Sequence, residues 1–407
     1  MSAPNPLVKL LASLSPPPVY MPVDYDGLEF KWKFFTFRPA LFQNEVYILA
    51  VILFYVAFSF IGRRTNLSKA NKWFEAHESL YAQQFSKPVQ EGGLTRDGNS
   101  DLFAFSTGRR AVSSLHTVFT MRPRHDFFQF AYQTLRGFVD LDWKVVDEVE
   151  LDFTFQDNGN VPECIWAIVA KDELKGIKAS RWDMSFTRTT ENASLPKSLT
   201  VMSGRCSYYS FERSMNSDTT EFADITDNIL RPHGPFNLAS ALSDPAFLPY
   251  FRSLSITDQP RTRPLAPLPA SQHTKHLILS LTVPPSSDSA VTLPLVEAVF
   301  KLVDVVAATG GWGIAKGPGG RSGMGLAQSL RPETRSKLRA IRENLHKELK
   351  EESVREQREE AENQKAAAKK KAEDERLSKL SAAEQKKQLD REKKRLLRKT
   401  QGKVKTR

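Results

Sequence analysis

The sequence is poor in cysteine and lacks the common motifs of catalysis. Its 407 residues include two cysteines, Cys164 and Cys206, which lie far apart and form no CxxC pair. Secreted domains held by disulfides usually carry more, so these two favour a reducing compartment and a cytosolic body. The patterns GxxxxGKS/T, GxGxxG, HExxH and GxSxG are all absent. Since these patterns mark common nucleotide-binding and hydrolytic sites, we predict no enzyme, no catalytic residue and no cofactor.

Histidines and acidic residues do not group into a metal site. His273 and His276 stand at HxxH spacing, but no cysteine, aspartate or glutamate lies within five residues of them. We therefore predict surface histidines and not metal ligands. Glu221, Asp224 and Asp227 follow a helical spacing, and we expect them to decorate an exposed helix face.

Charged residues are missing from one long stretch. Residues 46–62, VYILAVILFYVAFSFIG, carry no formal charge and are followed by Arg63 and Arg64. As a helix this run measures roughly 25 Å, and with the apolar residues just before it the run can cross a bilayer core of about 30 Å. We predict one transmembrane helix over residues 45–62. The alternative is a buried core helix, which rarely lacks polar side chains over such a length.

Positive charges on the two sides of this run predict its orientation. The positive-inside rule places the side with more lysine and arginine in the cytosol. The excess is small: Arg63, Arg64, Lys69 and Lys72 follow the run, and Lys31, Lys33 and Arg38 precede it. It favours a cytosolic C-terminal side. The segment at residues 7–14, LVKLLASL, is too short and interrupted for a signal peptide, so the span itself should act as the insertion signal.

The net charge of +11 belongs to the C-terminal tail. Residues 331–407 contain 26 Lys and Arg against 15 Asp and Glu, whereas residues 1–330 contain 32 of each. An anionic partner is therefore expected at the tail. The last 22 residues hold 11 basic and two acidic residues. The predicted RNA-binding residues are Lys386, Lys387, Arg391, Lys393, Lys394, Arg395, Arg398, Lys399, Lys403, Lys405 and Arg407.

The composition and position of the tail favour folded RNA as its anionic partner. It contains no Phe, Trp or Tyr, which argues against stacking on unpaired bases and for contact with folded RNA backbones. Anionic lipid is the rival partner, and a solvated charge run without a partner is the other alternative. The basic block lies at the far end of a long spacer and not beside the span. A membrane-docked ribosome is therefore the favoured partner.

We expect residues 63–309 to fold as an α+β body. The predicted strands cover residues 102–106, 149–155, 251–256 and 276–283, and the predicted helices cover 109–121, 126–139 and 293–308. A turn at residues 157–159 predicts a hairpin from the second strand into residues 164–170. Strands and helices do not alternate regularly, so α+β is the fold class.

The ends of the chain have their own patterns. Residues 1–44 form a short N-terminal segment, in which residues 28–37 alternate as a short strand or as an extended interfacial stretch. Residues 310–330 are rich in glycine and predict a flexible joint. Residues 331–407 predict a long charged helix or coiled coil with a narrow apolar seam and a break near Ser381. The seam consists of Leu338, Ile341, Leu345 and Leu349.

Two features of the body bear on what it contacts and on which side of the membrane it lies. The helix after the span places Trp73, His77, Leu80, Tyr81 and Phe85 on one stripe, which should bury against the body or against a partner. Two sequons, at Asn66 and Asn192, report topology, because a lumenal body would carry glycan on at least one of them. We expect both to be unmodified.

Several segments resemble, in order, the calumin family, whose members are the larger subunit of the PAT complex, the protein complex associated with the endoplasmic reticulum translocon. These segments are KANKWFEAHESL at residues 69–80, directly after the span, STGRR at 106–110, HLILSLTVP at 276–284 ahead of a closing helix, and the basic coiled-coil end with Lys403-Val-Lys405. The resemblance covers roughly residues 63–407.

The resemblance implies a function and a set of partners. It implies an endoplasmic reticulum membrane protein with a lumenal N-terminus and a cytosolic body, which helps multipass membrane proteins insert and fold. The implied partners are the small Asterix subunit, the Sec channel, the large ribosomal subunit with its RNA, and nascent multipass proteins. The implied partner-binding residues are Trp73, Phe74, His77, Leu80 and Tyr81.

One departure limits the resemblance. Animal members carry a signal peptide and a long acidic lumenal segment thought to bind calcium, whereas the first 45 residues here hold four acidic residues. This difference suits a fungal-type member, and calcium binding is not carried over. The alternative function is a general membrane tether for RNA or anionic lipid, without a role in protein insertion.

Overall fold

The computed structural model describes residues 27–33, 35–38, 43–89, 93–140, 145–156, 160–185, 187–204, 223–232, 236–264, 267–269, 272–308 and 324–378. The chain divides into two compact units. The larger one combines residues 1–262 with 274–334, and the smaller one combines residues 263–273 with 335–407.

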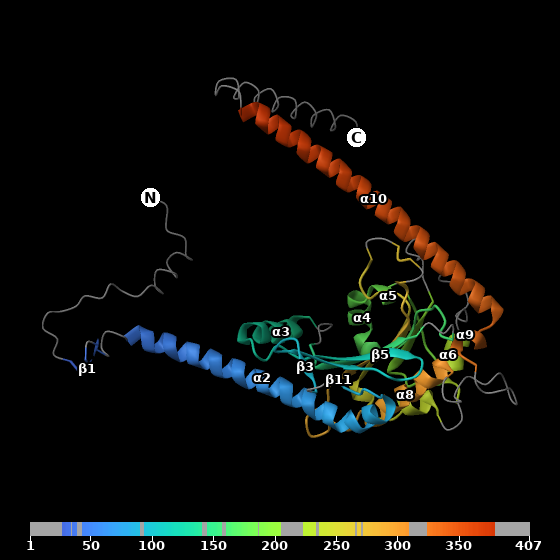
Figure 1. Ribbon diagram of the computed structural model, residues 1–407, viewed down its shortest axis with the longest axis horizontal. Helices are drawn as coiled ribbons and strands as arrows, with labels where there is room; N and C mark the ends of the chain where they lie inside the picture. The colour runs from blue at the N-terminus through green and yellow to red at the C-terminus, as the bar shows by residue number, and fades with distance from the viewer. Residues whose placement is uncertain are drawn as a thin grey trace. The chain divides into compact units, whose positions relative to one another are not determined.

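The larger unit is built on one antiparallel sheet of nine strands (Figure 1). Across the sheet the strands follow the order β3-β4-β5-β6-β11-β10-β7-β9-β8, and each neighbouring pair is antiparallel. The strands are β3 (Thr95–Arg96), β4 (Asp101–Ser106), β5 (Val112–Thr120), β6 (Glu148–Phe155), β7 (Trp166–Ala170), β8 (Arg188–Thr190), β9 (Leu199–Ser203), β10 (Phe251–Thr257) and β11 (His276–Thr282). With the helices described below, this confirms the α+β class.

One face of the sheet packs on the core helices α2 (Gln43–Gln84) and α8 (Leu293–Ala307). In β6 every second side chain is buried, as the alternation of its sequence predicts. From this face Phe153 of β6 meets Phe300 of α8, with ring centroids 5.2 Å apart. Phe119 of β5 meets Trp73 of α2 at 5.5 Å. These aromatic contacts join the second half of α2 and the predicted closing helix to the sheet.

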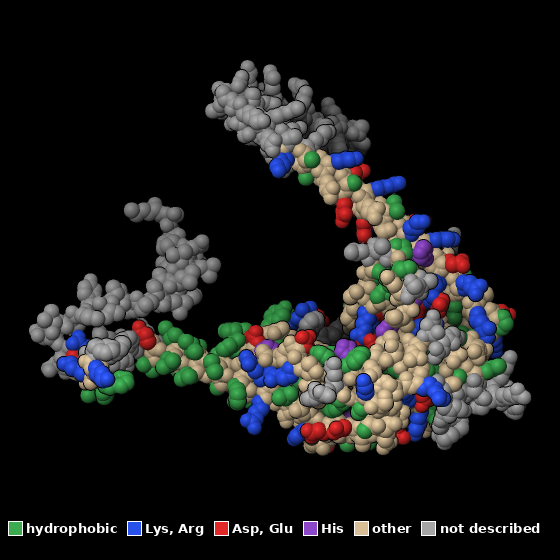
Figure 2. All heavy atoms as spheres, viewed as in Figure 1, with side chains coloured by type: hydrophobic (Ala, Val, Ile, Leu, Met, Phe, Trp, Pro, Cys, Tyr) green, Lys and Arg blue, Asp and Glu red, His purple; other side chains and the backbone are tan. Residues whose placement is uncertain are grey.

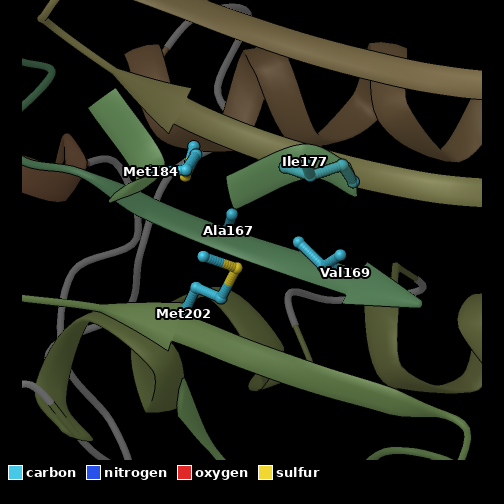
Figure 3. Packing of buried hydrophobic residues seen from close by; sticks show 5 residues of the cluster. All are labelled: Ala167, Val169, Ile177, Met184 and Met202. Carbon is cyan, nitrogen blue, oxygen red and sulfur yellow. The ribbon is translucent and has the colours of Figure 1, made fainter. Parts of the chain in front are cut away.

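The other face is covered at the β7–β9 end by two short helices. Ala167 and Val169 of β7 and Met202 of β9 pack with Ile177 of α4 (Leu174–Ser180) and Met184 of α5 (Trp182–Ser185), and all five are buried. Figure 3 shows these side chains converging from the two strands and the two helices. This small core closes the end of the sheet that lies farthest from β3.

Two sequence predictions for the sheet are wrong. Residues 109–121 were expected to form a helix but contain β5, because Leu115, Thr117 and Phe119 alternate with less buried side chains at a period of two. The predicted hairpin from β6 into β7 is also wrong, because β11 and β10 lie between these two strands. The predicted strands at 102–106, 149–155, 251–256 and 276–283 and the helices at 126–139 and 293–308 are confirmed.

The remaining elements are short, apart from α3 (Phe127–Val139) and α10 (Pro332–Ser378). They are β1 (Phe30–Trp32), β2 (Phe35–Phe37), η2 (Lys171–Glu173), α6 (Ala223–Leu230), α7 (Leu238–Leu242), η3 (Leu248–Tyr250) and α9 (Leu326–Ser329). Residues 28–37, expected as a short strand or an extended interfacial stretch, contain the antiparallel pair of β1 and β2.

The glycine-rich joint falls mostly outside the described residues. Its described end forms α9, where Leu326 and Leu330 are buried and the amide of Ala327 donates to the carbonyl of Asn160 (2.8 Å). Helix α10 contains 47 residues, so it is about 70 Å long. Leu345 and Leu349 of the predicted seam are buried. The break expected near Ser381 lies outside the described residues.

Candidate membrane-facing site

Helix α2 continues from the predicted membrane span into the body without a break. It contains 42 residues, which corresponds to about 63 Å. Large apolar side chains from Val46 to Ile61 are mostly exposed, whereas a stripe beginning at Gly62 is buried. Among the described residues, α2 is the one helix long and apolar enough to cross a membrane. Its first half therefore offers a bare apolar surface, and its second half belongs to the core.

The buried stripe of α2 corrects the predicted partner contact. Trp73, Phe74, His77, Leu80 and Tyr81 are all at most 7% exposed. Their aromatic neighbours are body residues, among them Phe119 of β5 and Phe300 of α8. Of the two alternatives drawn from the sequence, the structure places this face against the protein's own body. These five side chains therefore contribute to the core of the body and offer little surface to a partner protein.

A chain of hydrogen bonds satisfies the polar atoms on this stripe. The indole N–H of Trp73 donates to Oγ1 of Thr292 (3.0 Å), and Thr292 lies 3.2 Å from Nε2 of His77. The other ring nitrogen of His77 lies 2.7 Å from the Trp73 carbonyl oxygen, which can only accept. Nδ1 of His77 therefore carries a proton. Burial lowers the pKa of His77 to about 4, although these hydrogen bonds partly oppose the shift.

A charged cluster joins α2 to the loop before α3, just beyond the end of the apolar run. The Asp147 carboxylate accepts two hydrogen bonds from the guanidinium of Arg124 (2.7 and 2.8 Å) and one from Lys69 (2.9 Å). It also accepts the backbone N–H of Arg122 (3.0 Å). The side chain of Asn66, which is fully buried, donates to the Arg122 carbonyl (3.0 Å) and accepts from Arg124 (2.9 Å).

These contacts determine the protonation state of Asp147. Burial alone would raise its pKa, but the hydrogen bonds from Arg124, from the Arg122 amide and from Lys69 outweigh burial and lower the pKa to about 2. The carboxylate is therefore charged at neutral pH and bridges α2 to the loop before α3. We name Asp147, Arg124, Arg122, Lys69 and Asn66 the boundary cluster.

Helix α3 begins where the boundary cluster ends. Asp126 caps it, with Oδ1 accepting the backbone N–H groups of Phe128 (3.0 Å) and Gln129 (3.1 Å). None of its 13 residues is buried. Phe128, Phe138 and Val139 are 73%, 81% and 88% exposed. Helix α3 therefore presents a large apolar face that no described part of the chain covers.

Helix α3 lies beside the apolar half of α2 (Figure 1). The ring of Phe127 meets those of Phe54 (5.8 Å) and Phe58 (5.4 Å) edge to face. Phe130 also contacts Phe58, at 6.3 Å. Figure 2 shows hydrophobic side chains gathered along the first half of α2 and over α3. The two helices thus form one continuous apolar surface.

Gly62 permits this close approach. A Cβ at this position would lie 1.9 Å from the carbonyl oxygen of Arg124 and 2.7 Å from the amide nitrogen of His125. Both neighbours are backbone atoms, so no side chain could move aside. Glycine is therefore needed here for packing, and it separates the exposed part of α2 from the buried stripe.

Other predicted site residues have ordinary roles or lie outside the described residues. Asp224 pairs with Arg331 (3.2 Å) and accepts from Thr334 (2.9 Å), so it anchors the start of α10 and is not on a free face. His276 lies 2.8 Å from Asp152. Among the described residues no histidine, cysteine or acidic side chains gather as a metal site. The predicted RNA-binding residues 386–407 lie outside the described residues.

Sequence reasoning missed the boundary cluster and the surface of α3. The only local signal for the cluster was Asp147 just before a strand, because its partners come from distant segments. For α3 a signal was present: the sequence FFQFAYQTLRGFV is aromatic on one side of a helix. The sequence predicts this helix but not what covers its aromatic face, because periodicity alone does not distinguish protein from lipid as the covering medium.

These features define a class of protein: a membrane-anchored protein in which one helix passes directly from a lipid-compatible segment into an antiparallel α+β body, followed by a long charged helix. The chain belongs to the PAT complex subunit CCDC47 family, whose family model matches residues 41–211 and 213–399.

A similar protein indicates which cellular membrane is involved. The chain is similar to the UPF0674 endoplasmic reticulum membrane protein C2G5.01 of Schizosaccharomyces pombe (strain 972), with 26% identity over 388 residues. The matched region covers 89% of this chain and 87% of that protein. Together the two findings support a PAT-complex-type role at the endoplasmic reticulum membrane, as the resemblance noted from the sequence implied.

Proposed function

We propose that this protein is a non-enzymatic, single-span subunit of an intramembrane chaperone complex at the translocon. In this proposal it binds ribosomes and assists the insertion and folding of multipass proteins in the endoplasmic reticulum membrane. The N-terminus is lumenal, and the body and tail are cytosolic. The proposed partners are a small Asterix-like subunit, the Sec channel, the large ribosomal subunit and nascent multipass proteins.

One observation carries the proposal beyond membership of the family. The helix that carries the apolar span also forms the core of the body through Trp73, His77 and Tyr81. A body joined in this way stays directly at the membrane surface, where a ribosome docks. The tail supplies 26 basic residues against 15 acidic ones, and such a surplus suits contact with ribosomal RNA.

Charge reversal in the tail tests the ribosome contact. Lys393, Lys394, Arg395, Arg398 and Lys399 are changed to Glu, and co-sedimentation with large ribosomal subunits is measured over a range of salt concentrations. If these residues neutralise RNA phosphates, binding weakens and its salt dependence becomes shallower by roughly one power of salt concentration for each phosphate that is no longer neutralised.

A control reverses five basic residues on α10, which changes the net charge equally. Lys350, Arg355, Arg358, Lys365 and Lys371 are all exposed. The control should keep most of the binding and its salt dependence. If both variants lost ribosome binding to the same extent, the binding would reflect general charge attraction and not a specific contact of the tail end. Unchanged ribosome binding by the first variant would contradict the proposed RNA contact.

Purification in mild detergent distinguishes the proposed role from a general tether. Recovery of the Sec channel and large ribosomal subunits, including after nuclease removes free RNA, supports the translocon role. Recovery with free RNA or with lipid alone supports the tether.

A further inference from the structure

Helix α3 is divided lengthwise into an apolar and a polar side. At 100° per residue its apolar side chains cover an arc of about 200°. Gln129, Gln133 and Arg136 occupy the opposite side. Part of the apolar arc packs on α2 through Phe127 and Phe130. The remaining part is bare, and soluble monomers rarely expose so much contiguous apolar surface.

The contacts with α2 indicate how far inside the apolar run of α2 this bare face lies. Phe58 and Phe54 precede Arg63, the first charge after the apolar run, by five and nine residues. At 1.5 Å per residue, the two contact levels lie about 8 Å and about 14 Å inside that boundary. Amphipathic helices that lie in the plane of a bilayer bury their apolar faces by about 5–10 Å. The shallower of the two levels falls within this range, so the first turn of α3 is held at about the depth at which such helices meet acyl chains.

We propose that α3 lies in the leaflet of the bilayer on the side of the body, next to α2, with phospholipid acyl chains as the occupants of its bare face. Three observations favour lipid: its apolar surface is continuous with that of the span, its polar side carries Arg136, and exposed Arg63 and Arg64 lie at the same boundary. These cations complement anionic headgroups. The inference rests on the membrane span of the proposed function, but not on ribosome binding.

Contacts between α2 and the loop before α3 hold α3 at this depth. The boundary cluster ties the preceding loop to Asn66 and Lys69 of α2, and Gly62 lets that loop touch the helix backbone. The body is therefore attached to the bilayer at two elements. Two points of attachment fix the rotation of the body about the axis of α2, which one spanning helix leaves free.

Quenching of a fluorophore by labelled lipids tests this placement. In the full chain carrying Cys206→Ser, a single cysteine is introduced by Phe138→Cys and labelled with an environment-sensitive dye; Cys164 is buried. The protein is reconstituted alone into nanodiscs of phosphatidylcholine and phosphatidylserine. Some of the lipids carry a doxyl quencher, either near the headgroup or deep in the acyl chain.

Two matched positions serve as references. Val51→Cys replaces a residue that is 67% exposed in the apolar half of α2, and it reports the span. Phe105→Cys replaces an aromatic residue that is 41% exposed at the end of β4. The neighbouring Ser106 donates to the carbonyl of Pro88, beyond the C-terminal end of α2, so this position lies far from the membrane boundary.

The inference requires position 138 to be quenched several-fold more than position 105, with the shallow quencher more effective than the deep one. Quenching at position 51 but not at position 138 overturns the inference while leaving the anchor intact, and this is the result expected if a protein partner covers α3. Absence of quenching at both positions 51 and 138 would show that α2 does not span the bilayer. That result would contradict both the inference and the proposed membrane anchor.

Discussion

At the scale of single residues, two buried ionisable groups contribute to the response of the body to acid. His77 is neutral within the core because burial lowers its pKa to about 4. Asp147 is charged because its hydrogen bonds lower its pKa to about 2 in spite of burial. Both groups bind protons less readily in the folded than in the unfolded chain, so acid destabilises the body through each of them, but over different ranges of pH.

The first prediction concerns His77. From about pH 6.5, where the unfolded ring takes up a proton, down to about pH 4, the free energy of unfolding should fall by up to about 1.4 kcal/mol per pH unit. The total is on the order of 3 kcal/mol. Denaturant unfolding of the full chain in mild detergent, followed by tryptophan fluorescence at several pH values, measures this fall.

A His77→Gln variant provides the comparison. It should be less stable near neutral pH, because it interrupts the hydrogen bonds with Thr292 and the Trp73 carbonyl, but its stability should depend less on pH within this range. Parallel pH profiles for the variant and the parent protein would show that His77 is not the titrating group.

The second prediction concerns the boundary cluster. Asp147→Asn keeps the shape of the side chain but leaves Lys69 and Arg124 without a counter-ion. We expect a loss of about 2–4 kcal/mol in the free energy of unfolding, at or below the usual range for broken buried pairs because the two cations keep some exposure to solvent. In the parent protein this contribution should fade as the pH falls from about 3.8, where Asp147 of the unfolded chain begins to bind a proton, to about 2, where the folded carboxylate does.

Glu75→Gln is the control for this charge change. Glu75 is an exposed residue of α2, so its replacement should alter the free energy of unfolding by less than about 0.5 kcal/mol. If Asp147→Asn were equally mild, the cluster would not be what joins the loop to α2.

At the scale of elements, the sequence predicted those parts whose pattern is local. Alternation in β6 and the apolar face of α8 identified a strand and a helix, because their period reports burial directly. The pairing of β6 with β11 could not be predicted, because more than a hundred residues separate these strands and only tertiary packing brings them together. The stripe of α2 was recognised as buried, but its partner was not identified, since periodicity does not say what covers a face.

The third prediction concerns the packing of α3 on α2. Gly62→Ala places a methyl group against the backbone of Arg124 and His125, so the loop and α3 must move away from α2. We expect a loss of about 1–3 kcal/mol, typical of overpacking, and faster proteolysis within residues 123–140. Limited proteolysis of the full chain in nanodiscs measures the second effect.

Gly176→Ala is the matched substitution. Gly176 is also helical, but nothing lies within 4 Å of the point that a methyl group would occupy there. Alanine at this position should be neutral, or stabilising by up to about 1 kcal/mol through helix propensity. If the two substitutions had the same effect, close contact at Gly62 would not be what holds α3.

At the scale of the whole molecule, topology decides whether the proposed function is feasible. A lumenal body is expected to carry glycan on at least one of the two sequons, and the structure distinguishes them. Asn66 is buried and its amide donates to the carbonyls of Asn99 and Arg122, so it cannot carry a glycan in the folded body on either side of the membrane. Asn192 is only partly buried, and its side-chain oxygen accepts from the amide of Ser194.

The fourth prediction is that Asn192 carries no glycan in cells, because the proposed orientation places the body in the cytosol. Leu11→Asn serves as the positive control: it creates an Asn-Ala-Ser sequon at residues 11–13, identical to the sequon at residues 192–194 but on the other side of the membrane span. It should be glycosylated if the N-terminus is lumenal. Mobility shifts with and without endoglycosidase measure both, and glycan on Asn192 would contradict the proposed orientation.

The continuity of α2 has a mechanical consequence. Gln84 lies 22 residues beyond Gly62, about 33 Å along a rigid rod. A transmembrane helix adjusts its tilt to the thickness of the bilayer around it, and a change of about 20° would move that end of the rod sideways by roughly 11 Å. Local thinning of the membrane would therefore reposition the folded domain, so that the protein could convert bilayer thickness into movement on the other side of the headgroups.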